Sequence, residues 1–284
     1  MTWLLFLSVS IFAQALANVM NRVVMKSADK GTWAYSALSQ IITAGLIGIY
    51  ALIVGFELPP LFDLWPYFLA TVILNVGANI FQNEALRTAE VSFFTILSSS
   101  RILVSMFAAF LVLDEIITMW QGLGAVVMIA AITVAFSRHF EWKWETWMGY
   151  ALLYALSSGM VFIFDARILS EFHNVPSYMV FGFGLPGIAT ALIRPRIIPD
   201  IIRLAASRQV FSMALWSASY GFMAVTLWLA YQYGATASQM APIRQSAVIL
   251  TVLIAMVFLQ ERSHMVRKIV AALLAIFAVY LIST

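Results

Sequence analysis

Residues 3–21 read WLLFLSVSIFAQALANVMN, a run of 19 residues without a charged side chain. A transmembrane helix needs about 20 predominantly apolar residues, so this run has the length and composition of a membrane span. No basic residue precedes the run, and it is long for the apolar part of a signal peptide, so we expect a retained first helix. Further uncharged runs of spanning length follow at 32–56, 64–83, 116–137 and 146–164.

The whole chain has the composition of a membrane protein. Of its 284 residues, 63% are hydrophobic and 10% are charged, whereas soluble domains have about 45–50% apolar and about 25% charged residues. So few charges do not cover a water-exposed surface, and we expect an integral protein of the plasma membrane, which in a prokaryote is the inner membrane. The sequence has no cysteine, which excludes disulfides, thiol catalysis and cysteine-ligated metals.

The hydrophobic segments predict an all-α membrane fold of ten transmembrane helices. We expect them at about 3–24, 33–55, 64–86, 91–112, 117–137, 147–169, 176–194, 209–231, 236–259 and 266–283. The links are short, and no linker rich in Ser, Gly or Pro divides the chain, so residues 1–284 should form a single membrane domain. Short links leave no room for a soluble active site, which places the function at membrane depth.

The two halves of the chain repeat one another. Segment 89–92 (AEVS) aligns with 235–238 (ATAS), and 113–115 (LDE) with 259–261 (LQE), both at one ungapped offset of 146 residues. This register predicts two repeats of five helices, at about 1–140 and 141–284. Because five is odd, the second repeat enters the membrane in the opposite orientation, as in many secondary transporters, with a central cavity between the repeats.

Lysines and arginines are concentrated in the odd-numbered links between the predicted helices. Thirteen lie in or beside these links, and Arg167 alone lies beside an even-numbered one. Since basic residues favour the cytoplasmic side of a membrane, the bias predicts cytoplasmic odd links and both termini outside.

Three short motifs resemble the drug/metabolite transporter superfamily of the EamA type. They are Glu84-Ala85-Leu86-Arg87 near a helix end, the helix that closes on Leu113-Asp114-Glu115, and the following Gly122-Leu123-Gly124. Leu259-Gln260-Glu261 repeats the closing motif in the second half. The resemblance implies inverted five-helix repeats around a central cavity and transport by alternating access.

The chain departs from the pattern of that family at four positions. Ile102 and Val248 stand where a proline is usual, and Asp114 and Gln260 replace the usual glycine. Family members are usually assigned cytoplasmic termini, which conflicts with the charge count, and here we follow the charge count. The substrate does not carry over, because members transport amino acids, nucleotide sugars, drugs and other metabolites.

Two arginines are the most informative residues of the chain. Arg101 lies near the middle of the helix predicted at 91–112, where an arginine costs roughly 2.5–3.5 kcal/mol on insertion scales. Arg244 lies in the matching helix of the second half, about one turn from the equivalent position. The inverted repeat brings both toward one volume, and paired guanidinium groups favour a carboxylate or phosphate. The alternative is internal pairing with Asp165 or Glu84, which are also candidates for a coupling role.

Other candidate substrate contacts are polar or aromatic. Gln14 and Asn18 share one face of the first helix at a spacing of i, i+4, and Asn79 lies on a similar polar stripe of the third. Ser98 and Gln245 flank the arginines, and Trp216 and Tyr220 are candidates for an aromatic wall of the cavity. Helix-to-helix hydrogen bonding explains such polar residues about as often as ligand binding does. For the aromatic pair, core packing or the interfacial aromatic belt is the more common role.

These observations predict a secondary transporter for a small metabolite, with an anionic or zwitterionic substrate such as a carboxylate or amino acid. The alternatives are an exporter of cationic drugs or amphipathic metabolites and a non-transporting sensor or assembly protein. We expect no enzyme activity, cofactor, metal or nucleic-acid partner, because the sequence has neither an HExxH motif nor a nucleophile elbow. The expected partners are the lipid bilayer, a small-molecule substrate and a coupling ion such as a proton, and the protein is expected to be a monomer or a homodimer.

Overall fold

The computed structural model describes residues 2–26, 31–105, 107, 118–136, 144–235, 244, 247–260 and 265–282. The regular elements of this part of the chain are all helical. In the first half they are α1 (Thr2–Lys26), α2 (Thr32–Val54), α3 (Trp65–Thr88), α4 (Val91–Ser98) and α6 (Met119–Phe136). In the second half they are α7 (Thr146–Glu171), α8 (Val175–Ile193), η1 (Pro195–Ile197), α9 (Ile198–Ala205), α10 (Gln209–Gln232), α12 (Ala247–Phe258) and α13 (Met265–Ile282).

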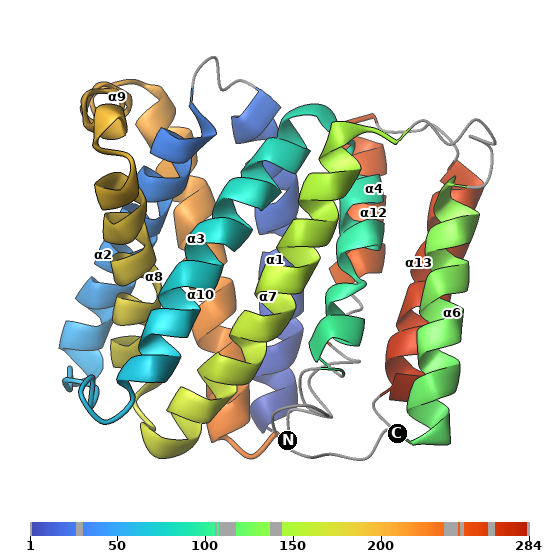
Figure 1. Cartoon of the computed structure of the whole chain (residues 1–284), viewed down its shortest axis with the longest axis horizontal. Coiled ribbons are helices and arrows are strands. Elements are labelled where there is room, and N and C mark those ends of the chain that lie inside the picture. Colours follow the sequence, from blue (N-terminus) through green and yellow to red (C-terminus); the bar gives the residue numbers. More distant parts are fainter. Residues whose placement is uncertain are drawn as a thin grey trace.

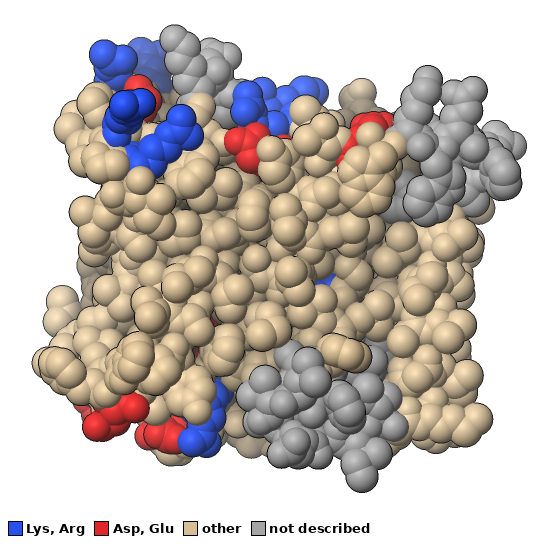
Figure 2. All heavy atoms as spheres, viewed as in Figure 1, with Lys and Arg blue, Asp and Glu red and all other residues tan. Residues whose placement is uncertain are grey.

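The long helices run side by side as a bundle, and both chain ends lie at the same end of it (Figure 1). Among the described residues, α1, α2, α7, α8 and α10 are long and apolar enough to cross a membrane. Figure 2 shows a broad, mostly uncharged band across the visible face of the bundle, with lysines, arginines and acids near its two ends. An apolar belt between polar ends is the surface that a bilayer requires, so the protein is an integral membrane protein.

Helix ends coincide with residues that favour them. Asn174 caps α8 by accepting a hydrogen bond from the Ser177 amide at 3.1 Å, and Pro176 occupies the first turn, where no intrahelical N–H bond is needed. Gly55 ends α2 at φ 116°, a conformation that a residue with a side chain rarely adopts. The uncharged runs of the sequence therefore begin and end as helices within a few residues of their predicted bounds.

The helices pack in pairs that join the two halves of the chain. The main partners are α1 with α10, α3 with α7, α2 with α8, and α6 with α13, and α4 also contacts α12. Small residues allow close contact: a Cβ added at Gly187 of α8 would lie 3.0 Å from Ile41 of α2. Each pairing joins a helix before residue 140 to one after it.

Buried polar side chains bond across these helix pairs. The Ser217 hydroxyl of α10 donates to the Ser39 carbonyl of α2 at 3.1 Å, and the Ser10 hydroxyl of α1 donates to the Met223 carbonyl of α10 at 2.9 Å. Such bonds satisfy polar groups that have no water at membrane depth.

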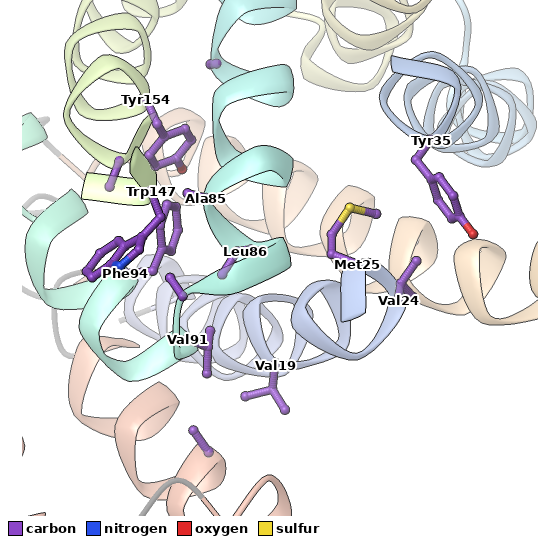
Figure 3. Close-up of a cluster of buried hydrophobic side chains, with 14 of the residues drawn as sticks. Val19, Val24, Met25, Tyr35, Ala85, Leu86, Val91, Phe94, Trp147 and Tyr154 are labelled. Atoms are coloured by element: carbon purple, nitrogen blue, oxygen red, sulfur yellow. The ribbon is translucent and has the colours of Figure 1, made fainter. Parts of the chain in front are cut away.

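The largest buried cluster of apolar side chains joins helices of the first half to α7. Its members include Val91 and Phe94 of α4, Leu86 of α3, and Trp147 and Tyr154 of α7 (Figure 3). The Phe94 and Tyr154 rings pack with their centroids 5.4 Å apart. This contact fixes the position of Tyr154, which faces the cavity described below.

The structure adds one feature to the predicted helices. The basic link at 194–208 contains the 3₁₀ turn η1 and the short helix α9, whereas the sequence analysis placed no helix there. In Figure 1, α9 lies at one end of the bundle and is seen almost end-on, so it runs across the direction of the long helices. The predicted helices at 91–112 and 236–259 are described in part, because 106, 108–117, 236–243 and 245–246 lie outside the described residues.

Candidate functional site

A cavity of about 150 Å³ lies inside the bundle, between helices of both halves. We name it the central cavity, and its polar and aromatic lining consists of Asn75, Asn79, Gln82, Arg101, Ser105, Tyr154, Ser158, Phe162, Asp165, Tyr178, Phe183, Tyr220, Trp228 and Arg244. Among the described lining residues, the charged ones are Arg101, Arg244 and Asp165. The cavity therefore combines two positive groups, one negative group and an aromatic wall.

Arg101 lies just after a local change of helix geometry. Around Ser98–Ser100 the backbone bonds span three residues instead of four, as in Ser100 N to Leu97 O at 3.1 Å and Leu103 N to Ser100 O at 2.9 Å. The Ser100 hydroxyl also bonds the Leu97 carbonyl, at 2.8 Å, which competes with the regular helical pattern. This tight turn directs Arg101 to the cavity, where its Nη1 donates to the Tyr154 hydroxyl at 3.4 Å.

Gly159 of α7 allows the Arg101 backbone to approach closely. A Cβ added at Gly159 would lie 2.6 Å from the Arg101 carbonyl oxygen and 2.8 Å from Cβ of Val104. The Ser105 hydroxyl donates to the Gly159 carbonyl at 2.9 Å and joins the same two segments. The absent side chain at Gly159 therefore sets how near Arg101 lies to α7.

Arg244 is held by the opposite half of the chain. Its Nε donates to Oε1 of Gln14 on α1 at 3.0 Å. Arg101 shows the mirrored arrangement, since it belongs to the first half and bonds Tyr154 on α7, the first long helix of the second half. Each arginine is thus oriented by a residue from the other half.

Asp165 is the acidic group of the central cavity. It accepts a hydrogen bond from the Tyr178 hydroxyl at 2.5 Å. Within the described part of the chain, no ion pair within 4.0 Å joins Asp165 to Arg101 or Arg244. The carboxylate therefore occupies a separate part of the cavity from the direct contacts of the guanidinium groups, so the site has two differently charged regions.

Aromatic rings form part of the wall. Phe162 and Trp228 stack with centroids 5.4 Å apart, and Phe183 packs edge-on against Tyr220 at 5.7 Å. Trp216 supports this wall from behind: it packs against Tyr220 at 6.0 Å but is buried and does not line the central cavity. A flat apolar surface of this kind suits the carbon skeleton of a small solute.

A smaller hollow, the side chamber, adjoins the central cavity. It is lined by residues that it shares with that cavity, namely Arg101, Tyr154 and Arg244, and by Gln14, Asn18, Phe94, Thr95, Ser98, Ser99, Ala247 and Val248. Asn18 also reaches Thr251 of α12 with a 3.4 Å bond from its amide nitrogen. The chamber brings the predicted residues Gln14, Asn18 and Ser98 to the two arginines, and Asp165 is not among its lining residues.

The structure thus brings most of the predicted site residues together and, among those it describes, leaves Trp216 and Glu84 outside the two hollows. Arg101, Arg244, Asn79, Tyr220 and Asp165 line the central cavity, and Gln14, Asn18 and Ser98 line the side chamber. Trp216 lies in the second layer described above. Gln245 lies outside the described residues.

Glu84, by contrast, lies near the end of α3. It accepts a hydrogen bond from Thr32 and pairs with Arg87 at 3.4 Å. It lines neither the central cavity nor the side chamber and is not brought to the arginines.

Several cavity residues were not among the predicted site residues. Tyr154, Tyr178, Gln82, Ser105 and Ser158 lie on apolar helices where one tyrosine or serine is common. Tyr178 lies thirteen residues after Asp165, on the next helix. Helical periodicity relates residues of one helix, so it did not predict the contact between these two. Among the described residues, no group of three or more His, Asp or Glu is placed to hold a metal ion.

Comparison with known proteins gives a family match and a fold match. Residues 1–137 match the EamA-like transporter family. No curated protein matches the chain significantly. A solved crystal structure aligns over 98% of this chain and 96% of its own, with a TM-score of 0.66 and 15% identity, a likeness that concerns the fold alone.

Proposed function

We propose that the chain is a member of the drug/metabolite transporter superfamily, since residues 1–137 match the EamA-like transporter family, and that it carries a small anionic or zwitterionic metabolite across the membrane by alternating access. The central cavity is the proposed binding site. The observation that carries the proposal is the presence of Arg101 and Arg244 on its wall, with no ion pair within 4.0 Å joining either to a carboxylate of the described residues.

Unpaired guanidinium groups at membrane depth need an anion or water to be stable. The bonds of Arg101 to Tyr154 and of Arg244 to Gln14 use one donor group each, and both partners are neutral. Since a guanidinium has five N–H donors, both arginines retain donors for a substrate carboxylate or phosphate. An incoming anion would satisfy those donors and neutralise part of the charge.

Asp165 supports a zwitterionic substrate or a proton-coupled one. Its carboxylate faces the same cavity and is bonded by Tyr178. An ammonium group on the substrate would meet Asp165 while the substrate carboxylate meets the arginines. A substrate without an ammonium group would instead place two negative groups in one small cavity, which favours uptake of a proton by Asp165. The sequence contains no P-loop, so an ion or solute gradient is the energy source that we propose.

The helix pairing supports two inverted repeats of five helices. When α1 to α4 and α6 are exchanged in order with α7, α8, α10, α12 and α13, the pair α1 with α10 becomes α7 with α3. The pairs α2 with α8, α4 with α12 and α6 with α13 become themselves. A pairing that survives this exchange is what a pseudo-two-fold relation between the halves produces. The two arginine contacts obey the same exchange, because α1 holds Arg244 and α7 holds Arg101.

The charge distribution supports an orientation in the membrane. Figure 2 shows most of the visible lysines and arginines at the end of the bundle where α9 lies. Arg167 lies near the end of α7, and α7 ends at the opposite end of the bundle (Figure 1). We therefore assign the α9 end to the cytoplasm and both termini to the outside. A C-terminal alkaline phosphatase fusion should then be active in cells, and a fluorescent reporter that matures only in the cytoplasm should stay dark. The reverse pattern would overturn the orientation without affecting the proposed substrate site.

The central test is ligand binding and transport by purified protein. A thermal-shift screen of amino acids, carboxylates, phosphates and aromatic cations should show stabilisation by acids or zwitterions, and counterflow in proteoliposomes should show transport of the same compounds. Arg101→Ala and Arg244→Ala should each weaken binding at least tenfold, because a hydrogen-bonded charge pair at a buried site contributes about 1.5–3 kcal/mol. Arg167→Ala is the matched control, since Arg167 is an exposed arginine of α7 that does not line the cavity. Unchanged kinetics in both cavity variants would refute the proposal.

A second candidate, export of an aromatic cation, rests on the aromatic wall beside Asp165. Phe162 and Trp228 stack in the lining of the cavity that also holds this carboxylate, and cations are attracted to aromatic faces. Stabilisation by aromatic cations that is lost in Asp165→Asn and kept in Arg101→Ala would favour this function. An absence of flux for the whole panel would favour a non-transporting sensor or assembly protein.

A further inference from the structure

The short helix α9 has three distinct faces. Ile197, Ile201 and Leu204 point to the protein: Ile197 and Ile201 pack with the first turns of α2, and Leu204 is buried in the largest apolar cluster. Ile198 and Ile202 point away, with exposed fractions of 43% and 64%. The helix is therefore fixed to the bundle on one side and presents isoleucines to its surroundings on another.

The exposed isoleucines continue the lipid-facing surface of the bundle. Leu192 and Ile193, at the end of α8 directly before the turn to α9, are 69% and 63% exposed. The apolar surface thus extends from α8 onto α9, and α9 lies across the direction of the long helices at the end of the bundle (Figure 1). An amphipathic helix in this position lies in the interface between hydrocarbon and headgroups.

Arginines form the third face of α9 and lie at both ends of the segment 194–208. Residues 194–208 contain four arginines, Arg194, Arg196, Arg203 and Arg208, and one acid, Asp200. All four arginines are exposed, and the pair between Arg203 and Asp200 is long, at 3.9 Å. The Arg194 guanidinium lies over the Trp33 ring at 5.4 Å, which holds this end of the segment against α2. Figure 2 shows the resulting basic group at the corner of the bundle where α9 lies.

We propose that α9 and its arginines form a binding surface for the headgroups of anionic phospholipids. The isoleucines face the acyl chains, and the arginines lie at headgroup level, where they meet lipid phosphates. A protein partner would leave the continuity of the α9 surface with the lipid-facing side of α8 unexplained, whereas a phospholipid matches the apolar and the basic face together. The excess of arginine over acid selects anionic lipids over zwitterionic ones.

The test compares phosphatidylglycerol with phosphatidylcholine. Purified protein in phosphatidylcholine nanodiscs is exchanged with increasing amounts of dioleoyl phosphatidylglycerol, and bound lipid is counted by native mass spectrometry after release. The parent protein should retain phosphatidylglycerol in preference, and the preference should fall as salt rises. Arg203→Gln/Arg208→Gln should reduce the preference by roughly tenfold or more, since each basic residue near an anionic surface contributes about a fivefold effect.

Matched variants separate this surface from general charge. Arg167→Gln removes an exposed arginine near the end of α7, at the opposite end of the bundle from α9, and should leave the lipid preference unchanged. An equal lipid preference in the parent and in Arg203→Gln/Arg208→Gln would overturn the proposal, as would an equal loss in Arg167→Gln. Displacement of phosphatidylglycerol by millimolar inorganic phosphate would also overturn it, because the site would then be one for free phosphate. Lipid binding is measured without any solute, so this outcome is independent of the proposed substrate.

Discussion

Gln14 of α1 orients Arg244 across the interior of the bundle, by accepting the Nε hydrogen of the guanidinium at 3.0 Å. The bond leaves the two terminal nitrogens of Arg244 for other partners on the cavity wall. Because Gln14 is buried and lies in the side chamber, it acts on a substrate through Arg244. It is therefore a positioning residue.

Removing this contact should weaken substrate binding. In Gln14→Leu, Arg244 loses its orienting acceptor, and the dissociation constant for an anionic ligand should rise about 5- to 30-fold, corresponding to about 1–2 kcal/mol. Gln14→Glu keeps an acceptor but adds a negative charge beside Arg244, so it should weaken anion binding further. Calorimetric titration with the tightest-binding ligand of the thermal-shift screen measures the dissociation constants of both variants. Tighter binding by Gln14→Glu than by Gln14→Leu would show that orientation matters more than the charge of Arg244.

Asp165→Asn should distinguish between a zwitterionic and a simple anionic substrate. If the substrate ammonium pairs with Asp165, affinity for an amino acid should fall at least tenfold, while affinity for the carboxylate without its amino group should stay equal or rise. The rise follows because one negative charge has left a cavity of about 150 Å³. Parallel calorimetric titrations of the parent protein and Asp165→Asn, with the amino acid and with the carboxylate that lacks its amino group, measure these changes in affinity.

Tyr178→Phe is the companion variant. It removes the 2.5 Å bond to Asp165 and keeps the carboxylate, so its effect should be smaller than that of Asp165→Asn. If Asp165→Asn lost the same affinity for the amino acid and for the carboxylate without an amino group, a contact between the substrate ammonium and Asp165 would be contradicted.

Gly159→Ala should disturb Arg101 through the backbone. The added Cβ would lie 2.6 Å from the Arg101 carbonyl oxygen, so one of the two segments has to move. Such overpacking costs about 1–3 kcal/mol, which should lower the melting temperature and weaken anion binding together. Gly45→Ala on α2 is the control, because nothing lies within 4 Å of its added Cβ. Its melting temperature should stay the same or rise, since alanine favours a helix over glycine.

The sequence was a good guide to the helices because membrane spans have a strong signal. A helix in lipid has to be apolar over nearly its whole length, so 3–24 and 209–231 were predicted within two residues of α1 and α10. Arg101 and Arg244 were found for the same reason, because a charge is conspicuous in an apolar helix. The prediction missed α9, since an eight-residue helix that contains a proline, an acid and an arginine is too short and too polar to give a spanning pattern.

The cavity as a whole was less predictable, because its geometry depends on packing between helices far apart in sequence. Tyr154 and Gln14 contact the arginines of the opposite halves, at separations of 53 and 230 residues. Glu84 and Asp165 looked equivalent as acids in helices, yet Glu84 pairs with Arg87 near a helix end and only Asp165 faces the cavity. Tertiary contacts separated the two, because Thr32 and Arg87 bind Glu84, whereas Tyr178 binds Asp165 beside the cavity.

The buried pair of Lys268 and Glu90 should respond unequally to loss of either partner. Lys268 of α13 is fully buried, lies over the Phe93 ring at 4.7 Å and donates to the Glu90 carboxylate, whose side chain is 34% exposed. Glu90→Ala removes a carboxylate that neutralises this fully buried ammonium, and it should cost up to about 3–5 kcal/mol, the range for breaking a buried ion pair. Lys268→Met leaves a carboxylate that water reaches, and it fills the apolar site with a side chain of similar length, so its cost should be smaller.

Thermal unfolding in detergent measures the two variants against Asp200→Asn. That control breaks the exposed pair with Arg203 and should change stability by less than about 1 kcal/mol. A lower melting temperature for Lys268→Met than for Glu90→Ala would mean that the lysine has a role beyond neutralising Glu90. Lys268 joins α13 to Glu90, the N-cap residue of α4, and Arg101 lies eleven residues after Glu90. Such a role would therefore connect the outer helix pair to the binding site.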